Sequence, residues 1–101
     1  MYVLFLAPNS YAMTVHAILE DIDADYELRW VNIFTDSPDA EFLEVSPHAR
    51  VPALQYPGGA LCETGAIAWF LSERFPQARL QVGEGDTHRG RFLQWFHFLA
   101  T

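Results

Sequence analysis

Three short segments carry the residue types that can hold and activate a small charged ligand. They are residues 8–11 (Pro-Asn-Ser-Tyr), residues 50–54 (Arg-Val-Pro-Ala-Leu) and residues 63–67 (Glu-Thr-Gly-Ala-Ile). A Gly58-Gly59 pair flanked by short apolar runs separates the second segment from the third and predicts a tight turn. The layout indicates a loop, a hairpin and a helix N-terminus that hold a small peptide by its main chain and its charged end.

The Val51-Pro52 step decides whether main-chain groups are available to a ligand. A cis bond at the head of a strand would turn the N–H and C=O of Val51 away from the sheet, free to pair with an extended peptide. Cis bonds make up only about 5–6% of X–Pro bonds in folded proteins. A trans proline at an edge strand is the simpler interpretation of Pro52 taken alone, so both isomers stay open at this point.

Glu63 and Thr64 match the two charges of a free amino-acid end. Glu63 closes the expected second strand of the hairpin, and Thr64 stands where the next helix begins. A helix N-terminus carries about half a positive charge and unpaired N–H groups that bind carboxylates, while the neighbouring acid can take an ammonium group. The alternative is an ordinary helix start beside a solvated glutamate.

Ser10 places a hydroxyl at the N-terminus of the first expected helix, where it can donate to an anion. If that anion is a thiolate, substantial ionisation at neutral pH needs its pKa of about 8.5 to fall by about one to two units, or roughly 1.4–2.7 kcal/mol. One hydrogen bond to a charged group supplies about 1.5–3 kcal/mol, and the helix terminus adds about 0.3–1 kcal/mol. No metal or separate base is therefore required, although capping the helix is the commonest task of a serine there.

Hydrophobic periodicity places these segments on an α/β framework. Apolar runs rich in β-formers predict strands at 2–6 and 26–33, and a hairpin at 51–55 and 60–62. Apolar residues at helical spacing predict helices at 11–22, capped by Ser10, and at 64–75, with a short irregular helix at 36–45. The predicted order is βαβαββα with a four-stranded mixed sheet, and its first half is a βαβ unit that needs a right-handed crossover.

The end of the chain predicts a second structural unit. A polar linker at 77–86 follows the first domain, 1–76, and a last helix occupies 87–101. Aromatic and leucine side chains cover most of that helix's circumference, and such a helix must be buried. We expect it to be the first helix of a truncated helical domain, or to be covered by a partner chain; the alternative is that it packs back on the first domain.

Composition excludes several classes of partner. The formal net charge of the 101 residues is −7 and Lys+Arg number only 6, so we expect no nucleic acid partner. No apolar stretch approaches the roughly 20 residues of a membrane helix, and the histidines show no metal-ligand spacing. One cysteine, Cys62, fits a reducing, cytoplasmic location, and we expect it to be a buried apolar side chain. We expect the three tryptophans to lie in the core or at an interface: Trp30, Trp69 and Trp95.

Over nearly its whole length the chain resembles the N-terminal, thioredoxin-like domain of a bacterial cytosolic glutathione transferase. The resemblance rests on the opening strand, residues 8–10, residues 46–54, residues 63–67 and the linker into an aromatic helix. The second and third of the three segments, at their separation, are its most specific part. It implies a cis proline whose preceding residue pairs with the cysteinyl main chain of glutathione.

The resemblance also implies the remaining site roles. Glu63 and Thr64 would grip the γ-glutamyl end, Arg50 would meet the glycyl carboxylate, and His48 would assist. Ser10 or Tyr11 would occupy the catalytic position. We expect Ser10 there, because Tyr11 would enter the first turn of the helix and point away, with Asn9 as an auxiliary donor.

The implied activity is attack of a glutathione thiolate on a small electrophile by a homodimer, with glutathione as co-substrate and no cofactor or metal. The absent helical domain would form most of the electrophile pocket, so this chain alone would have little activity. Two alternatives remain: a non-catalytic interaction module, and a glutathione-dependent isomerase. The module would use an acidic surface made of Asp36, Asp39, Glu41 and Glu44. Dithiol exchange is excluded because there is no Cys-x-x-Cys motif.

Overall fold

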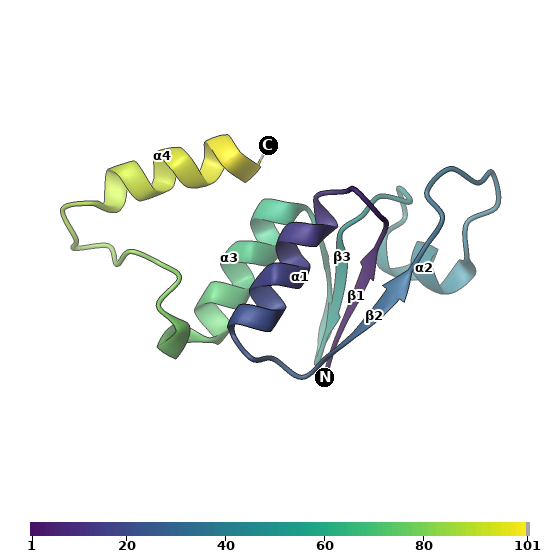
Figure 1. Ribbon diagram of the computed structural model, residues 1–101, viewed down its shortest axis with the longest axis horizontal. Coiled ribbons are helices and arrows are strands. Elements are labelled where there is room, and N and C mark those ends of the chain that lie inside the picture. The colour runs from purple at the N-terminus through teal and green to yellow at the C-terminus, as the bar shows by residue number, and fades with distance from the viewer. Residues whose placement is uncertain (101) are drawn as a thin grey trace.

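A four-stranded sheet with helices on both faces organises the protein (Figure 1). The computed structural model describes residues 1–100. Along the chain its elements are β1 (Tyr2–Leu6), α1 (Ala12–Asp21), β2 (Tyr26–Trp30), α2 (Ala40–Val45), β3 (Ala53–Tyr56), β4 (Gly59–Cys62), α3 (Thr64–Arg74), a short 3₁₀ helix η1 (Pro76–Ala78) and α4 (Arg89–Ala100). The strand order is β2-β1-β3-β4.

The sheet is mixed, as the sequence predicts. β1 pairs with β2 in parallel, as a βαβ unit requires, and with β3 in antiparallel orientation. β3 and β4 form a hairpin in which Tyr56 faces Gly59. The turn uses Gly58 at φ +106°, a backbone conformation that favours glycine. This arrangement is the thioredoxin-like fold.

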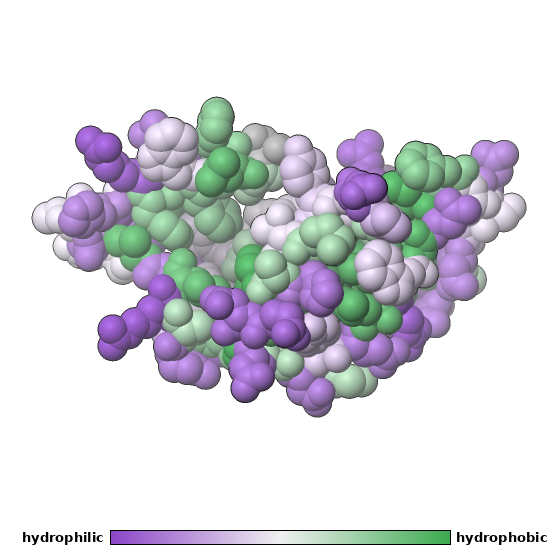
Figure 2. All heavy atoms as spheres, viewed as in Figure 1, coloured by the Kyte–Doolittle hydropathy of each residue, from purple (hydrophilic) through white to green (hydrophobic). Residues whose placement is uncertain are grey.

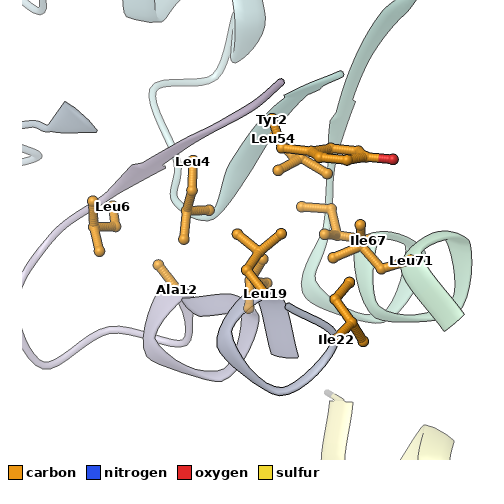
Figure 3. Packing of buried hydrophobic residues seen from close by; sticks show 10 residues of the cluster. Tyr2, Leu4, Leu6, Ala12, Leu19, Ile22, Leu54, Ile67 and Leu71 are labelled. Atoms are coloured by element: carbon orange, nitrogen blue, oxygen red, sulfur yellow. The ribbon is translucent and has the colours of Figure 1, made fainter. Parts of the chain in front are cut away.

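The larger core lies between the sheet and the α1 and α3 helices. Alternate side chains of β1 point toward these helices, where Leu4 meets Leu19 from α1 and Ile67 from α3 in one buried cluster (Figure 3). Each of these three side chains is fully buried. Burying an aliphatic side chain of this size stabilises the fold by about 1.5–3 kcal/mol, so this layer fixes α1 and α3 against the sheet.

The opposite face of the sheet packs against α2. Phe5 from β1 stacks on Phe42 from α2, with ring centroids 5.8 Å apart, in a second cluster that includes Val45 and Ala53. Asp39 caps α2 by accepting from the N–H of Glu41 at 2.9 Å. Both faces of the sheet are therefore covered, which explains the continuous apolar run of β1.

Several element boundaries differ from the predicted ones. β2 ends at Trp30 and not at residue 33, because Asn32 turns the chain by accepting from the N–H of Phe34. The predicted helix at 36–45 begins only at Ala40, after the Asp39 cap. The last helix begins at Arg89 and not at residue 87. Turn-forming side chains override the apolar pattern at each of the first two boundaries.

The last helix, α4, is not buried within this chain, and the expected cover from a further domain or a partner chain stays a prediction. The helix packs on α3 along one side, where Trp69 meets the rings of Phe92 and Phe96. Gly65 permits the approach, since a Cβ there would lie 3.3 Å from the Cβ of Ala100. No residue of α4 is buried, and Figure 2 shows hydrophobic atoms on the surface over this helix. Thr101, the last residue of the predicted helix, lies outside the described residues.

Two of the three tryptophans lie outside the core of this chain, so for them the interface alternative stays a prediction. Trp30 is 56% exposed at the end of β2, and Trp95 is 52% exposed on α4, whereas Trp69 lies between α3 and α4. Within residues 1–100 no helix combines the length and apolarity needed to cross a bilayer. The same residues hold no group of three potential metal-ligating side chains.

Candidate functional site

A cleft of about 340 Å³ brings together parts of all three segments singled out in the sequence. Its lining residues are Tyr11, Arg50, Val51, Pro52, Cys62, Glu63, Thr64 and Ala100. The sheet register explains why they meet. Phe5 pairs with Ala53, and Ala53 pairs with Cys62, so the end of β1, the start of β3 and the end of β4 lie side by side at one edge.

The Val51–Pro52 peptide bond is cis. Val51 is half-buried and precedes β3, whose ladder begins at Ala53. Among residues 1–100 no other residue forms a hydrogen bond with the main-chain N–H or C=O of Val51. The cleft therefore presents one unpaired main-chain donor and acceptor, the groups an extended peptide needs for strand-like pairing.

Glu63 lies at the junction of β4 and α3 with an unusual backbone. Its φ is 76° and its ψ is 120°, and such a conformation costs a non-glycine residue about 1–3 kcal/mol. The Glu63 carboxylate does not cap α3 and makes no hydrogen bond within the described chain. Thr64 begins α3, whose first N–H groups have no side-chain cap. An uncapped helix N-terminus thus lies beside a free carboxylate in the same cleft.

The N-terminus of α1 differs from the sequence-based preference for Ser10. The Ser10 hydroxyl donates to the carbonyl of Ala7 at 2.7 Å and accepts from the N–H of Ala12 at 3.3 Å. Ser10 is half-buried and does not line the cleft. Tyr11 is 65% exposed and does line it, which departs from the expectation that it lies away from the site; which of the two hydroxyls is catalytic stays a prediction.

Asn9 and His48 lie outside the cleft. Asn9 has φ 56° and lines a neighbouring cavity of about 430 Å³ with Pro8, Asn32 and Phe34. His48 is exposed on the loop after α2 and borders neither cavity. The structure therefore brings six of the nine predicted site positions near one another at the cleft, counting Arg50, Val51, Pro52, Glu63, Thr64 and Tyr11.

Ser46 positions Arg50, a role that the sequence analysis did not identify. This serine is 1% exposed. Its hydroxyl donates to the carbonyl of Arg50 at 2.9 Å and accepts from the N–H of Arg50 at 3.0 Å. Both main-chain groups of Arg50 are thereby held while its guanidinium remains exposed. A serine directly after a helix and before Pro47 was the available signal.

Cys62 and Ala100 are the other lining residues that the sequence analysis did not identify. The Cys62 thiol is half-buried, not fully buried as expected, and donates to the carbonyl of Val45 at 3.2 Å. Its position next to Glu63 in the sequence was the available signal. Ala100 reaches the cleft from α4, and its place depends on helix packing that no local pattern encodes.

Comparison with known proteins agrees with this architecture. Residues 4–79 match the family described as "Glutathione S-transferase, N-terminal domain". A crystal structure of a glutathione transferase from Methylococcus capsulatus shares 32% identity, with a TM-score of 0.88, over 100% of this chain and 51% of that one. A sphingomonad glutathione S-transferase complexed with glutathione shares 31% identity, with a TM-score of 0.83, over 98% of this chain and 51% of that one.

A curated relative adds a second activity to the comparison. Maleylacetoacetate isomerase of Pseudomonas aeruginosa is 32% identical over 84 residues, which cover 79% of this chain and 39% of the isomerase. Fungal proteins also match. The chain spans between 28% and 46% of the length of the curated relatives that it matches.

The fold and the cleft define the class: a thioredoxin-like α/β domain with an open ligand cleft where β3, β4 and the helix N-termini meet. The family match covers residues 4–79, about three quarters of the 101 residues, and runs from β1 past the 3₁₀ helix, so it is not local to one motif. The chain belongs to the glutathione S-transferase N-terminal domain family.

Proposed function

We propose that this chain is the glutathione-binding half of a glutathione transferase, which activates the thiol of glutathione for attack on small electrophiles. The observation that carries the proposal is the cleft in which Val51, Glu63 and Thr64 meet. Family membership and the glutathione-bound sphingomonad structure support it.

The two ends of the cleft match the two ends of the tripeptide. The free carboxylate of Glu63 takes the ammonium of the γ-glutamyl residue, and the uncapped N-terminus of α3 at Thr64 takes its carboxylate. The unpaired N–H and C=O of Val51 pair with the cysteinyl main chain. Arg50 meets the glycyl carboxylate, where a guanidinium gives a charge-assisted hydrogen bond. Every charge of the ligand thus meets a group of opposite sign.

We assign the thiol to the Tyr11 end of the cleft. Tyr11 lines the cleft and is 65% exposed, while the hydroxyl of Ser10 donates to the carbonyl of Ala7. Donation to the sulfur stabilises the thiolate, which then forms the new bond to the electrophilic carbon. Ser10 orients the first turn of α1, and remains the alternative donor if it rotates away from Ala7. Asn9 and His48 keep secondary roles in this proposal.

The predicted domain organisation, location and oligomeric state of the whole protein are also proposals. Residues 1–76 form the glutathione domain, 77–86 a linker, and 87–101 the start of a helical domain that completes the electrophile pocket. The exposed Trp95 and Leu99 support a cover over α4. We further propose a cytoplasmic homodimer of bacterial type; two bacterial structural relatives support the bacterial origin.

A direct test is calorimetric titration of the intact protein with glutathione. Glu63→Ala is expected to weaken binding about 10- to 100-fold, since a hydrogen-bonded charge pair contributes roughly 1.5–3 kcal/mol. Glu84→Ala, an exposed acid outside the cleft, serves as the matched control and should bind normally. A folded wild-type protein that takes up no glutathione would reject the proposal and favour an interaction module.

The isomerase is the second candidate, favoured by the match to the Pseudomonas protein. Isomerisation uses the same thiolate: it adds to a double bond, the adduct rotates, and the thiolate leaves again without net consumption of glutathione. Measuring whether glutathione is consumed therefore separates the two. Stoichiometric loss of free thiol supports the transferase, and turnover with constant thiol supports the isomerase.

A further inference from the structure

The outer edge of β2 is an unpaired strand edge. β2 is the end strand of the sheet, and two hydrogen bonds fix which of its residues face β1: Tyr2 N–H to Asp25 C=O, and Val31 N–H to Leu6 C=O, both 2.9 Å. The N–H and C=O groups of successive strand residues point in alternate directions, so Glu27 and Arg29, like Asp25 and Val31, point these groups toward β1. The N–H and C=O of Tyr26, Leu28 and Trp30 therefore point outward, and no residue in 1–100 pairs with them.

This edge lacks several features that protect an exposed strand, and its two charged residues, Glu27 and Arg29, have opposite signs. Natural edges are protected by proline, bulges or charged side chains, lysine above all. The five residues of β2 include no proline, and their register with β1 is continuous. The one basic side chain, Arg29, is paired with Glu27 at 2.8 Å and with Glu41. The edge is thus open to another strand.

The sequence of β2 is symmetric in chemistry about its centre. It reads aromatic, acid, Leu28, base, aromatic. If two copies pair antiparallel about Leu28, Glu27 lies opposite Arg29 of the other copy, and Tyr26 lies opposite Trp30. The main-chain directions fit this register, because Leu28, the central residue, is one of those that point outward. A register shifted by one residue would place main-chain groups that point toward β1 at the centre, and the hydrogen bonds between the two copies would be lost.

The side chains needed for this contact are accessible. The side chains of Glu27 and Arg29 are 42% and 39% exposed, and Trp30 is 56% exposed. Directly opposite acid–base and aromatic pairs are the units that stabilise neighbouring antiparallel strands. Residues in non-hydrogen-bonded register, as Glu27 and Arg29 would be, have the closest side chains.

We propose that β2 is a self-association edge, at which two copies of this chain pair antiparallel about Leu28 to form a continuous eight-stranded sheet. The contact is isologous, so each copy supplies the same strand. Roughly six main-chain hydrogen bonds form, from three outward-facing pairs. Five residues bury less than a standard interface of about 1,600 Å², and the net charge of −7 on each copy opposes approach, so the pairing is transient and depends on concentration.

Charge complementarity selects a second copy over an unrelated strand. An unrelated basic strand would satisfy Glu27 but would face Arg29 with like charge. A second copy offers each side chain a partner of opposite charge, through two symmetric pairs, beside the Glu27–Arg29 pair already present within each chain. Glu41, which also pairs with Arg29, adds a negative charge near the contact in each copy, and the resulting repulsion keeps the association weak.

Two charge-reversal variants of the full chain give a sharp test. Glu27→Arg places arginine opposite arginine in the self-pair, and Arg29→Glu places glutamate opposite glutamate, so neither variant should pair with itself. When the two variants are mixed, residues 27 and 29 of one variant lie opposite residues 29 and 27 of the other, and each of these pairs combines an acid with a base. A fluorescently labelled Glu27→Arg chain, followed by sedimentation velocity, is expected to bind unlabelled Arg29→Glu about tenfold more tightly than unlabelled Glu27→Arg.

A second pair of variants keeps the charges unchanged. Trp30→Pro removes one outward N–H without touching the β1 ladder, and Trp30→Ala removes only the ring. Stronger self-association of the alanine variant than of the proline variant supports the main-chain pairing. Circular dichroism confirms that each variant is folded. If the folded charge variants show no preference for each other, or if the wild type stays unassociated at every concentration, the proposal is overturned.

Discussion

Removing each of the two hydroxyls at the start of α1 in turn separates activation of the ligand from stability of the helix. In Tyr11→Phe the ring and its place on the cleft remain, and only the hydroxyl is lost. In Ser10→Ala the hydroxyl that bridges Ala7 and Ala12 is lost, at 2.7 Å and 3.3 Å respectively. We expect the first change to raise the pKa of bound glutathione and the second to lower the stability of the fold.

The magnitudes follow from the hydrogen bonds involved. One hydrogen bond to a thiolate is worth about 1.5–3 kcal/mol, so its loss in Tyr11→Phe raises the pKa of the bound thiol by roughly one to two units at 1.36 kcal/mol per unit. Loss of the half-buried Ser10 hydroxyl leaves Ala7 and Ala12 without that partner and costs about 1 kcal/mol. For a domain of this size that lowers the midpoint of thermal unfolding by about 4–8 °C.

The assay is ultraviolet titration of the thiolate in the glutathione complex of the intact protein, combined with thermal unfolding followed by circular dichroism. Tyr11→Phe should shift the thiol titration at nearly unchanged stability, and Ser10→Ala should do the reverse. A raised thiol pKa in Ser10→Ala together with an unchanged one in Tyr11→Phe would refute the assignment. That result would mean that Ser10 leaves Ala7 when glutathione binds.

Three further predictions concern the fold, and chemical denaturation measures each of them. Asp39→Ala removes the cap of α2 and should cost about 1 kcal/mol, whereas Asp36→Ala, an exposed turn residue, should be neutral. Ile67→Ala opens a cavity in the main core and should cost about 2–5 kcal/mol. The hydrogen bond to Glu20 raises the pKa of Tyr26, so that contribution to stability is present below pH about 10 and is lost as the pH rises through the raised value; Glu20→Gln should remove most of this loss.

Each of these predictions can fail in a specific way. Equal losses for Asp39→Ala and Asp36→Ala would show that the cap does not support α2. A cost below about 1 kcal/mol for Ile67→Ala would mean that the core collapses around the missing methyl groups. An unchanged alkaline profile in Glu20→Gln would show that another group titrates there.

Much of the fold follows from the sequence because its patterns are local. The apolar run of β1, the Gly58-Gly59 turn and the spacing of Ile67 and Leu71 each determine an element through neighbouring residues. The order of elements then leaves few ways to assemble the sheet. The predictions of the parallel β1–β2 pair, the β3–β4 hairpin and the four-stranded sheet are confirmed.

Side-chain direction at element ends could not be predicted in the same way. Tyr11 was expected to point away from the cleft, yet one residue of difference in where α1 begins rotates a side chain by about 100°, and helix starts are uncertain by one or two residues. Ser10 shows the same problem, because Ala7, its hydrogen-bond partner, directly follows β1 and lies outside the helix. Competition for a hydroxyl proton is decided by three-dimensional contacts.

The candidate site depends on topology more than on any single side chain. The hairpin register pairs Ala53 with Cys62, so the residues just before β3 and just after β4 must be neighbours however the turn is made. The pairing of Phe5 with Ala53 then brings the start of α1 to the same edge. Unpaired main-chain groups and helix N-termini therefore collect there as a consequence of strand order. Two properties of the cleft depend on residue identity. One is its preference for ligand charges, which Arg50 and Glu63 provide; the other is the hydroxyl near the ligand's thiol. Substitutions at those positions should change which ligand binds while the cleft itself persists.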